Sequence, residues 1–563
     1  MRNVLQHELF ADNLADLYAH RVLHDPDLVF IKFEDRVMTY SEFDRCVARL
    51  RDGLTAQGLE PGTIVAAFME NSPALLALLL ACAQQGLVWA PMSPVSKRRD
   101  LAYTLADTGP GMVFVDDGLS GLLAEVMAGS SVPLVVVGGR GLLPDALDDD
   151  RVSVPQDGWS LPEWTGAALR DPSGPSDYHR APAVTARDVL CIIYSGGTTG
   201  MPKGIVIPHF YAISAALRLH EMADFGDDEC VFTSLQLFHS WVPLTILPFC
   251  MYYRHPMAFT RWWSASTFLD NAIRFSATVV DLPISMLATL LKQPDEGRQQ
   301  EHRAWLLVAA LGGADPACVA MVEEFEKRFG IRTLQMYALT EAGPLAITEH
   351  ASEPRRRGSS GTARGWYEVE IADEEGMQCP PGQRGEILLR PRIPNIMALG
   401  YHNKQAQTVA TWRDLWIHTG DEGYLDADGY LYFVGRKDFF LRRRGEVVSI
   451  AEVEAVLMDC PGVEDAAVVA VASELGEDDI KACVVAAPGT SAEAIYRYCL
   501  DELSYYKVPR YIELLRELPR SATKREPERH RLGGLDPQRV WDGGPRRAPA
   551  DATVHPTASL QQE

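Results

Sequence analysis

The chain has 563 residues, which is too many for one hydrophobic core and therefore predicts at least two domains. Its 53 Lys and Arg residues against 76 Asp and Glu residues give a formal net charge of −23, which argues against nucleic-acid binding, because basic surfaces supply that affinity. The ten cysteines show no C-x-x-C spacing, and the longest apolar run, residues 73–83, is about half of the ~20 residues that span a bilayer. With no signal-peptide pattern at the start, we expect a cytoplasmic protein with reduced thiols.

The first 140 residues alternate helical and strand patterns. Apolar spacing of the helical kind occupies three segments, residues 13–22, 40–57 and 72–85. Strand patterns occupy four, residues 29–33, 37–39, 63–68 and 87–90. Such alternation predicts an α/β sheet with helical crossovers, and Ser41 is the expected N-cap of the second helix. Residues 145–188 have few periodic apolar positions, and we interpret them as a long surface excursion.

The most informative stretch is residues 191–209, CIIYSGGTTGMPKGIVIPH. A β-branched strand pattern runs into a loop of small residues, and a second strand pattern follows the loop. Glycines let backbone N–H groups converge on an anion, the hydroxyls of Thr198 and Thr199 add donors, and Lys203 supplies positive charge. The loop lacks the G-x-x-x-x-G-K-[ST] spacing of the P-loop. It predicts a phosphate cradle, for which a flexible surface turn is the alternative.

The segment YSGGTTGMPKG resembles the signature loop of the adenylate-forming superfamily, which includes acyl-CoA synthetases, luciferases and the adenylation domains of peptide synthetases. The resemblance implies that Thr198, Thr199, Gly200 and Lys203 bind the phosphates of ATP. The family pattern is T-S-G-T-T-G, and here Gly196 stands where a serine hydroxyl is expected. One donor to phosphate is therefore absent from the loop.

Two further segments match the family in order. Residues 238–241, FHSW, resemble a PLFH segment of acyl-CoA synthetases, which implies that His239 lies at the wall of the acyl pocket. The alternative is a buried histidine that is hydrogen-bonded at a strand end. Trp241 would pack in the interior or shorten the pocket. Gly313 and Ala314 follow a strand pattern and correspond to the family loop that lies against adenine.

The segment YALTE at residues 337–341 resembles the family pattern Y-G-x-T-E, with Ala338 in place of glycine. The resemblance implies that Tyr337 stacks on adenine, that Thr340 reaches the α-phosphate and that Glu341 holds Mg²⁺. A carboxylate suits this last role, since Mg²⁺ prefers oxygen ligands that it shares with phosphates. A strand followed by an N-capped turn is the alternative interpretation.

Later segments, WIHTGD and GRKD, also match. The resemblance implies that Asp421 accepts hydrogen bonds from both ribose hydroxyls and that Arg436 reaches the ribose or a phosphate. Asp438 would be the hinge between a large N-terminal AMP-binding domain, residues 1–435, and a small mobile domain, residues 436–535.

The C-terminal part of the chain is similar to the carnitine or crotonobetaine type of CoA ligase within the superfamily. The last family motif, P-K-T-x-T-G-K, carries a lysine that meets the α-phosphate and carboxylate oxygens. This chain reads LPRSATKREP and lacks the glycine, so Arg525 takes the place of the lysine without a gap and Lys524 takes it with a shift of one residue. Residues 536–563 are polar and rich in Pro, Ala and Gln, and we expect them to be disordered.

The expected fold class is α/β, with a large N-terminal domain of α/β sheets and a small α+β C-terminal domain joined by a hinge. The resemblance implies an acid–CoA ligase that uses ATP, Mg²⁺ and CoA on a small organic acid, through acyl-AMP and with release of pyrophosphate. One alternative is a diazotase that activates nitrite with ATP and diazotises an aryl amine. The other is a non-catalytic nucleotide-binding relative. We expect neither nucleic acid nor a membrane as partner, and whether the chain forms a homodimer is left open.

Overall fold

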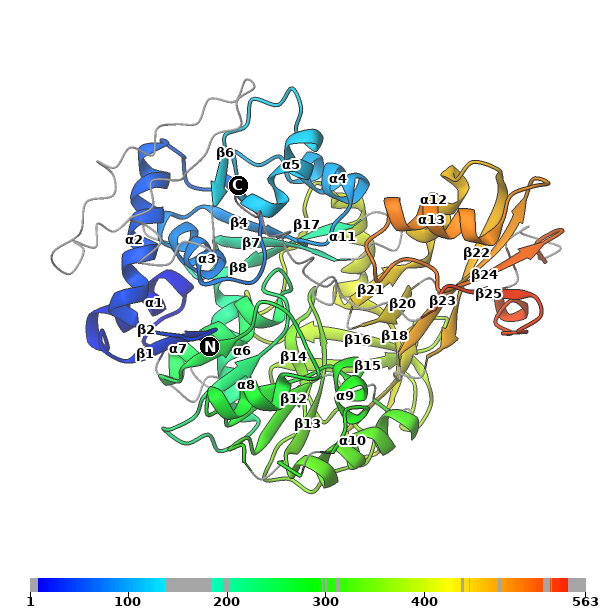
Figure 1. Cartoon of the computed structure of the whole chain (residues 1–563). Coiled ribbons are helices and arrows are strands. Elements are labelled where there is room, and N and C mark those ends of the chain that lie inside the picture. Colours follow the sequence, from blue (N-terminus) through cyan, green and yellow to red (C-terminus); the bar gives the residue numbers. More distant parts are fainter. Residues whose placement is uncertain are drawn as a thin grey trace. The chain divides into compact units, whose positions relative to one another are not determined.

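The computed structural model describes most of the chain (Figure 1). The described residues are 9–137, 184–195, 202–295, 297–298, 301–309, 313–314, 316–436, 440–444, 446–473, 477–519, 527 and 529–544. The chain divides into two compact units, a large one of Met1–Glu452 with Ala472–Asp478 and a small one of Val453–Val471 with Asp479–Glu563. Both units combine helices with sheets, which confirms the predicted α/β fold class. The predicted hinge residue Asp438 lies outside the described residues.

The first sheet of the large unit has eight strands in the order β14-β13-β12-β11-β9-β10-β1-β2. They are β1 (Val29–Phe33), β2 (Arg36–Thr39), β9 (Val231–Thr233), β10 (Met257–Phe259), β11 (Val279–Asp281), β12 (Leu306–Ala309), β13 (Arg332–Leu339) and β14 (Gly343–Thr348). The inner strands pair in parallel, and the edge strands β2 and β14 pair antiparallel to their neighbours. The inner strands are short, apolar and largely buried, as parallel strands covered on both faces are.

The second sheet of the large unit has seven strands in the order β17-β8-β7-β4-β3-β5-β6. They are β3 (Ile64–Phe68), β4 (Val88–Met92), β5 (Met112–Asp116), β6 (Leu134–Val137), β7 (Val189–Ser195), β8 (Lys203–Pro208) and β17 (Gly400–Tyr401). Strands β3 to β7 pair in parallel, whereas β8 is antiparallel to both β7 and β17. The predicted phosphate cradle is the segment of the chain that connects β7 to β8.

The helices of the large unit pack in several hydrophobic clusters. These helices are α1 (Leu14–His24), α2 (Tyr40–Ala56), α3 (Pro73–Gln85), α4 (Arg98–Thr108), α5 (Ser120–Val126), α6 (His209–Glu221), α7 (Leu247–Tyr253), α8 (Phe268–Arg274), α9 (Ile284–Leu291), α10 (Pro316–Phe329) and α11 (Gln405–Thr411). Helices α1, α2, α3, α6 and α7 share the main core with both sheets, α8, α9 and α10 pack in a second cluster, and α4 and α5 in a third. Helix α3 is apolar on all sides and almost wholly buried against α1, α2 and β4. Its ends are as the sequence suggests, with Ser72 as N-cap and Gly86 in the left-handed conformation after the last turn.

The predicted N-cap of α2 is wrong. Thr39 has the extended backbone of a cap, and its side chain accepts from the backbone N–H of Glu42, whose carboxylate accepts from the Thr39 N–H in return. Ser41 lies inside the first helical turn, so its hydroxyl cannot serve as the cap.

A third, antiparallel sheet of the large unit has the order β15-β16-β18-β19. Its strands are β15 (Tyr367–Ala372), β16 (Gly385–Pro391), β18 (Ile417–Leu425) and β19 (Leu431–Arg436). A short hairpin of β20 (Phe440–Arg443) and β21 (Glu446–Ser449) follows.

The chain enters the small unit within α12 (Ile450–Asp459). This unit carries the sheet β22-β23-β24-β25, with β22 (Val463–Ala472), β23 (Asp478–Ala486), β24 (Tyr511–Leu515) and β25 (Val540–Asp542), and the helix α13 (Ala492–Glu502). The expected disorder after residue 536 is wrong for β25, which pairs antiparallel with β24. The Trp541 ring packs on Tyr496 with 4.8 Å between centroids, and Asp542 accepts from Arg510 at 3.0 Å, so packing and an ion pair hold this strand. Within the described residues, no helix is both long and apolar enough to cross a membrane.

Candidate functional site

The two strands that flank the predicted phosphate cradle, β7 and β8, pair antiparallel with each other. Ser195, the last residue of β7, pairs with Lys203, the first residue of β8. Lys203 is only 7% exposed, so its position is fixed by the fold. The loop between them, with Thr198, Thr199 and Gly200, lies outside the described residues. The structure thus places one predicted phosphate ligand, and the roles of the others stay predictions.

Tyr337 and Asp421 meet although 84 residues separate them in the chain. The Tyr337 hydroxyl donates to Asp421 Oδ2 at 2.6 Å, a short bond of the charge-assisted kind. Both side chains are buried, Tyr337 on β13 of the eight-stranded sheet and Asp421 on β18 of the antiparallel sheet. Asp421 is also paired with Arg436 in the β18–β19 register. Two residues that the sequence assigns to adenine and ribose are therefore neighbours.

Phe433, which the sequence analysis missed, contacts both the predicted adenine loop and Tyr337. The backbone N–H of Ala314 donates to the Phe433 carbonyl oxygen at 3.0 Å. Gly313 has a φ of +62°, and a Cβ atom at this position would lie 2.6 Å from the same oxygen. The rings of Phe433 and Tyr337 have centroids 5.8 Å apart. A glycine is required here by both the left-handed backbone and the close approach of β19.

Thr340 and Glu341 follow directly on β13 and contact two further segments. The hydroxyls of Thr340 and Ser240 are 3.2 Å apart. The Tyr401 hydroxyl donates to Glu341 Oε1 at 2.9 Å, and the Lys203 ammonium lies 5.0 Å from the centre of the Tyr401 ring. Tyr401 thus connects the predicted Mg²⁺ ligand with the cradle lysine, and no motif of the sequence marked it.

A Mg²⁺ site built by protein side chains alone is absent from the part of the chain that the structure describes, where no three His, Cys, Asp or Glu residues cluster as a metal site would need. A single carboxylate such as Glu341 fits a Mg²⁺ ion that takes its other ligands from nucleotide phosphates and water.

The segment of the predicted acyl-pocket wall, residues 238–241, follows β9, which ends at Thr233. His239 is exposed, so the alternative of a buried histidine at a strand end is wrong. The backbone N–H of Trp241 donates to His239 Nδ1 at 3.4 Å, and its indole N–H donates to Asp281 Oδ2 at 2.7 Å. Burial raises the pKa of Asp281 to about 7. Trp241 is itself buried, which agrees with a packing role.

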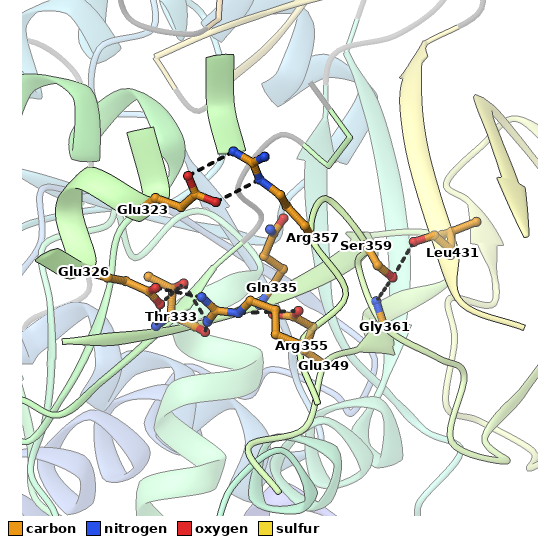
Figure 2. A network of polar contacts seen from close by, with 10 residues as sticks. All are labelled: Glu323, Glu326, Thr333, Gln335, Glu349, Arg355, Arg357, Ser359, Gly361 and Leu431. Atoms are coloured by element: carbon orange, nitrogen blue, oxygen red, sulfur yellow. Dashed lines mark hydrogen bonds and ion pairs between the residues drawn. The ribbon is translucent and has the colours of Figure 1, made fainter. Parts of the chain in front are cut away.

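A polar network holds residues 355–361 (Figure 2). Arg355 donates to Glu326 at 2.7 Å, and Arg357 pairs with Glu323 of the same helix, α10, at 2.8 Å. These two ion pairs fix residues 355–357 to α10.

The same segment continues into Gly358 and Ser359. The Ser359 hydroxyl donates to the Leu431 carbonyl oxygen at 3.0 Å and accepts from the Gly361 N–H at 3.0 Å (Figure 2). A Cβ atom on Gly358 would come within 3.2 Å of the Ala314 Cα atom. No local pattern in the sequence indicates these two ion pairs, because each arginine binds a partner about thirty residues away along the chain.

Several predicted site residues remain unplaced. Lys524, Arg525 and Asp438 lie outside the described residues, and Arg436 is described only in its backbone. The described site therefore unites the following residues, in chain order: Lys203, Ser240, Gly313, Ala314, Tyr337, Thr340, Glu341, Tyr401, Asp421 and Phe433.

Comparison with known proteins gives two matches to family models. A model described as "AMP-binding enzyme" matches residues 18–402, and one described as "AMP-binding enzyme C-terminal domain" matches residues 452–525. A crotonobetaine/carnitine–CoA ligase from Escherichia coli O139:H28 is 27% identical over 518 residues, which cover 91% of this chain and 96% of that protein.

Solved structures share the fold. An o-succinylbenzoate CoA synthetase double mutant from Bacillus subtilis superposes with a TM-score of 0.77 at 22% identity, over 93% of this chain and 99% of that one. An amide bond synthetase from Marinactinospora thermotolerans gives a TM-score of 0.76 at 22% identity, over 92% and 98%. An anthranilate CoA ligase in complex with anthranoyl-AMP gives 0.67 at 25% identity, over 94% and 97%.

Proposed function

Because the chain belongs to the family of AMP-binding enzymes, the adenylate-forming superfamily, we propose that it is an acid–CoA ligase. In this proposal a small organic acid attacks the α-phosphorus of ATP, pyrophosphate leaves and an acyl-AMP forms. The sulfur of CoA then attacks the acyl carbon, and AMP leaves. The observation that carries the proposal is the meeting of Tyr337, Asp421 and the Gly313–Ala314 loop around Phe433.

Each of these groups suits one part of a nucleoside. Asp421 accepts from the Tyr337 hydroxyl through Oδ2, and its carboxylate is the acceptor proposed for the ribose hydroxyls. The Tyr337 ring, which lies 5.8 Å from the Phe433 ring between centroids, and the backbone of Gly313 and Ala314 are proposed to contact the purine. Thr340 and Glu341 leave β13 directly beyond Tyr337, which is the direction that the phosphates would take.

Catalysis in this proposal rests on charge. Attack by a carboxylate oxygen places additional negative charge on the α-phosphate, and positive groups fixed beforehand stabilise it. Lys203 supplies one such charge, and Lys524 or Arg525 is proposed to supply another. Glu341 would hold Mg²⁺, which neutralises phosphate oxygens as a Lewis acid when bound. None of these residues needs to act as a nucleophile.

The acceptor is proposed to be CoA, since relatives that cover nearly the whole chain are CoA ligases. The small domain is proposed to turn about Asp438 between adenylation and transfer. A second candidate is a nitrite-activating diazotase. It is favoured by Gly196, which removes a hydroxyl from the phosphate loop, and by the altered terminal motif around Lys524, because both changes affect the centre where the small oxyanion would react.

The test is a product screen with the full chain. ATP and Mg²⁺ are combined with carnitine, crotonobetaine, and a panel of aliphatic and aromatic acids, each with and without CoA, and with nitrite plus an aryl amine. AMP is quantified, and the products are identified by mass spectrometry. An acid that gives AMP and an acyl-CoA supports the main proposal, whereas AMP only with nitrite and the amine supports the second. AMP formation with none of them would contradict both and favour a non-catalytic nucleotide-binding protein.

A further inference from the structure

Residues 400–404, which we call the clasp, join both strands that flank the phosphate cradle. The clasp begins as β17, which pairs antiparallel with β8 at Ile205 and Val206. The His402 N–H then donates to the Gly204 carbonyl oxygen at 2.7 Å, next to Lys203. The root of the cradle on the β8 side is thus tied to the clasp by backbone bonds.

The β7 side is tied through Asp107 of α4. Asn403 donates to the Asp107 carbonyl oxygen at 3.0 Å, and the Lys404 ammonium donates to its Oδ1 at 2.7 Å. The other oxygen of Asp107 accepts from the Tyr194 hydroxyl at 2.9 Å, and Tyr194 is the residue before the end of β7. The clasp therefore fixes the spacing of the two cradle strands.

Within the clasp, Tyr401 is held in one orientation. Its backbone N–H donates to the Thr408 hydroxyl at 2.9 Å, and its ring packs edge-on against Trp412 with 5.6 Å between centroids. From this position its hydroxyl reaches Glu341 Oε1 at 2.9 Å, while its ring lies 5.0 Å from the Lys203 ammonium.

We propose that Tyr401 is a positioning residue that orients the Glu341 carboxylate towards the metal–nucleotide complex and keeps Lys203 beside it. A phenol that donates to one carboxylate oxygen fixes the plane of the group, so that the second oxygen points in a defined direction. The negative face of the ring attracts an ammonium and restrains a side chain that otherwise has four rotatable bonds. The inference rests on the proposed function, since it gives Glu341 and Lys203 the roles stated there.

The test replaces the hydroxyl alone. Tyr401→Phe keeps the ring, the packing on Trp412 and the contact with Lys203, and removes the bond to Glu341. We expect the dissociation constant of Mn²⁺, measured by electron paramagnetic resonance in the presence of ATP and without acid, to rise ~10-fold or more, as is typical when the support of a metal ligand is lost. The Mg²⁺ concentration for half-maximal AMP release should rise by the same factor, and high Mg²⁺ should restore the rate.

Tyr430→Phe is the matched control, because it removes a phenol-to-carboxylate bond of the same kind, from Tyr430 to Glu353 at 3.2 Å, that involves neither Glu341 nor the clasp. We expect it to bind Mn²⁺ as the wild-type chain does. Wild-type Mn²⁺ affinity in Tyr401→Phe, or an equal loss in both variants, would overturn the role of the hydroxyl while leaving the proposed function intact if the wild type releases AMP. A wild-type chain that binds no Mn²⁺ with ATP would overturn the inference and the metal role of Glu341 together.

Discussion

Gly313 offers the sharpest test of the predicted adenine loop. Its φ of +62° is a conformation that an alanine adopts at a cost of roughly 1–2 kcal/mol. The added Cβ atom would also lie 2.6 Å from the Phe433 carbonyl oxygen and 3.0 Å from the Phe433 Cβ atom. Such crowding typically costs a further ~1–3 kcal/mol, because backbone atoms must move. For Gly313→Ala we therefore expect a loss of roughly 2–5 kcal/mol in the free energy of unfolding, or a displaced loop.

Gly330→Ala is the matched control. Gly330 has a φ of +67°, and no heavy atom lies within 4 Å of a Cβ atom built there. This variant should lose only roughly 1–2 kcal/mol in the free energy of unfolding, the cost of the left-handed backbone conformation. Thermal unfolding and calorimetric binding of ATP are measured on both variants and on the wild type. We expect Gly313→Ala to unfold at a lower temperature than Gly330→Ala. We also expect it to bind ATP at least about tenfold more weakly, which corresponds to a loss of about 1.4 kcal/mol in the free energy of binding. Equal unfolding temperatures together with wild-type ATP affinity in Gly313→Ala would refute the reasoning.

Four further results are expected. Burial raises the pKa of Asp281 to about 7 from an ordinary 3.8, so the stability that its folded-state proton contributes is complete below pH 3.8 and is lost as the pH rises to 7. Asp281→Asn should therefore make the thermal unfolding midpoint depend less on pH over that range. An unchanged dependence on pH would contradict this. Asp421→Ala should bind ATP and 2′,3′-dideoxy-ATP equally, whereas the wild type should prefer ATP by about tenfold or more; a preference that persists in the variant would exclude the ribose role. Lys524→Ala should slow adenylation by ~10²–10³ and Arg525→Ala only mildly, and the opposite order would place Arg525 at the α-phosphate. Asp438→Pro should preserve one half-reaction, measured separately as AMP formation and acyl transfer, because proline fixes φ; an equal loss of both would argue against a hinge.

The sequence predicted what is encoded locally. The alternation of helices and strands before residue 140 and the two strand patterns on either side of the cradle correspond to observed elements, whereas the antiparallel pairing of those two strands was not predicted. The Thr39 cap was also readable, since Thr39 and Glu42 have the spacing of a capping box. The motif residues Tyr337 and Asp421 were predicted to bind the same nucleotide, and in the structure the Tyr337 hydroxyl lies 2.6 Å from Asp421 Oδ2.

What the sequence could not predict depends on contacts between distant segments. Tyr401 gains its place from the pairing of a two-residue strand with β8 and from bonds to Thr408 and Glu341, and no local pattern specifies these partners. Phe433 contributes its backbone carbonyl oxygen, an atom that every residue type has, so its identity gave no signal. Strand β25 has only three residues, too few to show a strand pattern, and its contacts are with the distant segments β24, Tyr496 and Arg510.

The central claim is that this chain forms an adenylate, and the nucleotide products test it most directly. The wild-type chain and Glu341→Ala are incubated with ATP, Mg²⁺ and the acid that the product screen identifies, and AMP, ADP, pyrophosphate and phosphate are quantified. The account predicts AMP and pyrophosphate in equal amounts, only when the acid is present, with a nearly complete loss in a folded Glu341→Ala variant. ADP and phosphate as the products, or wild-type AMP formation by Glu341→Ala, would contradict it.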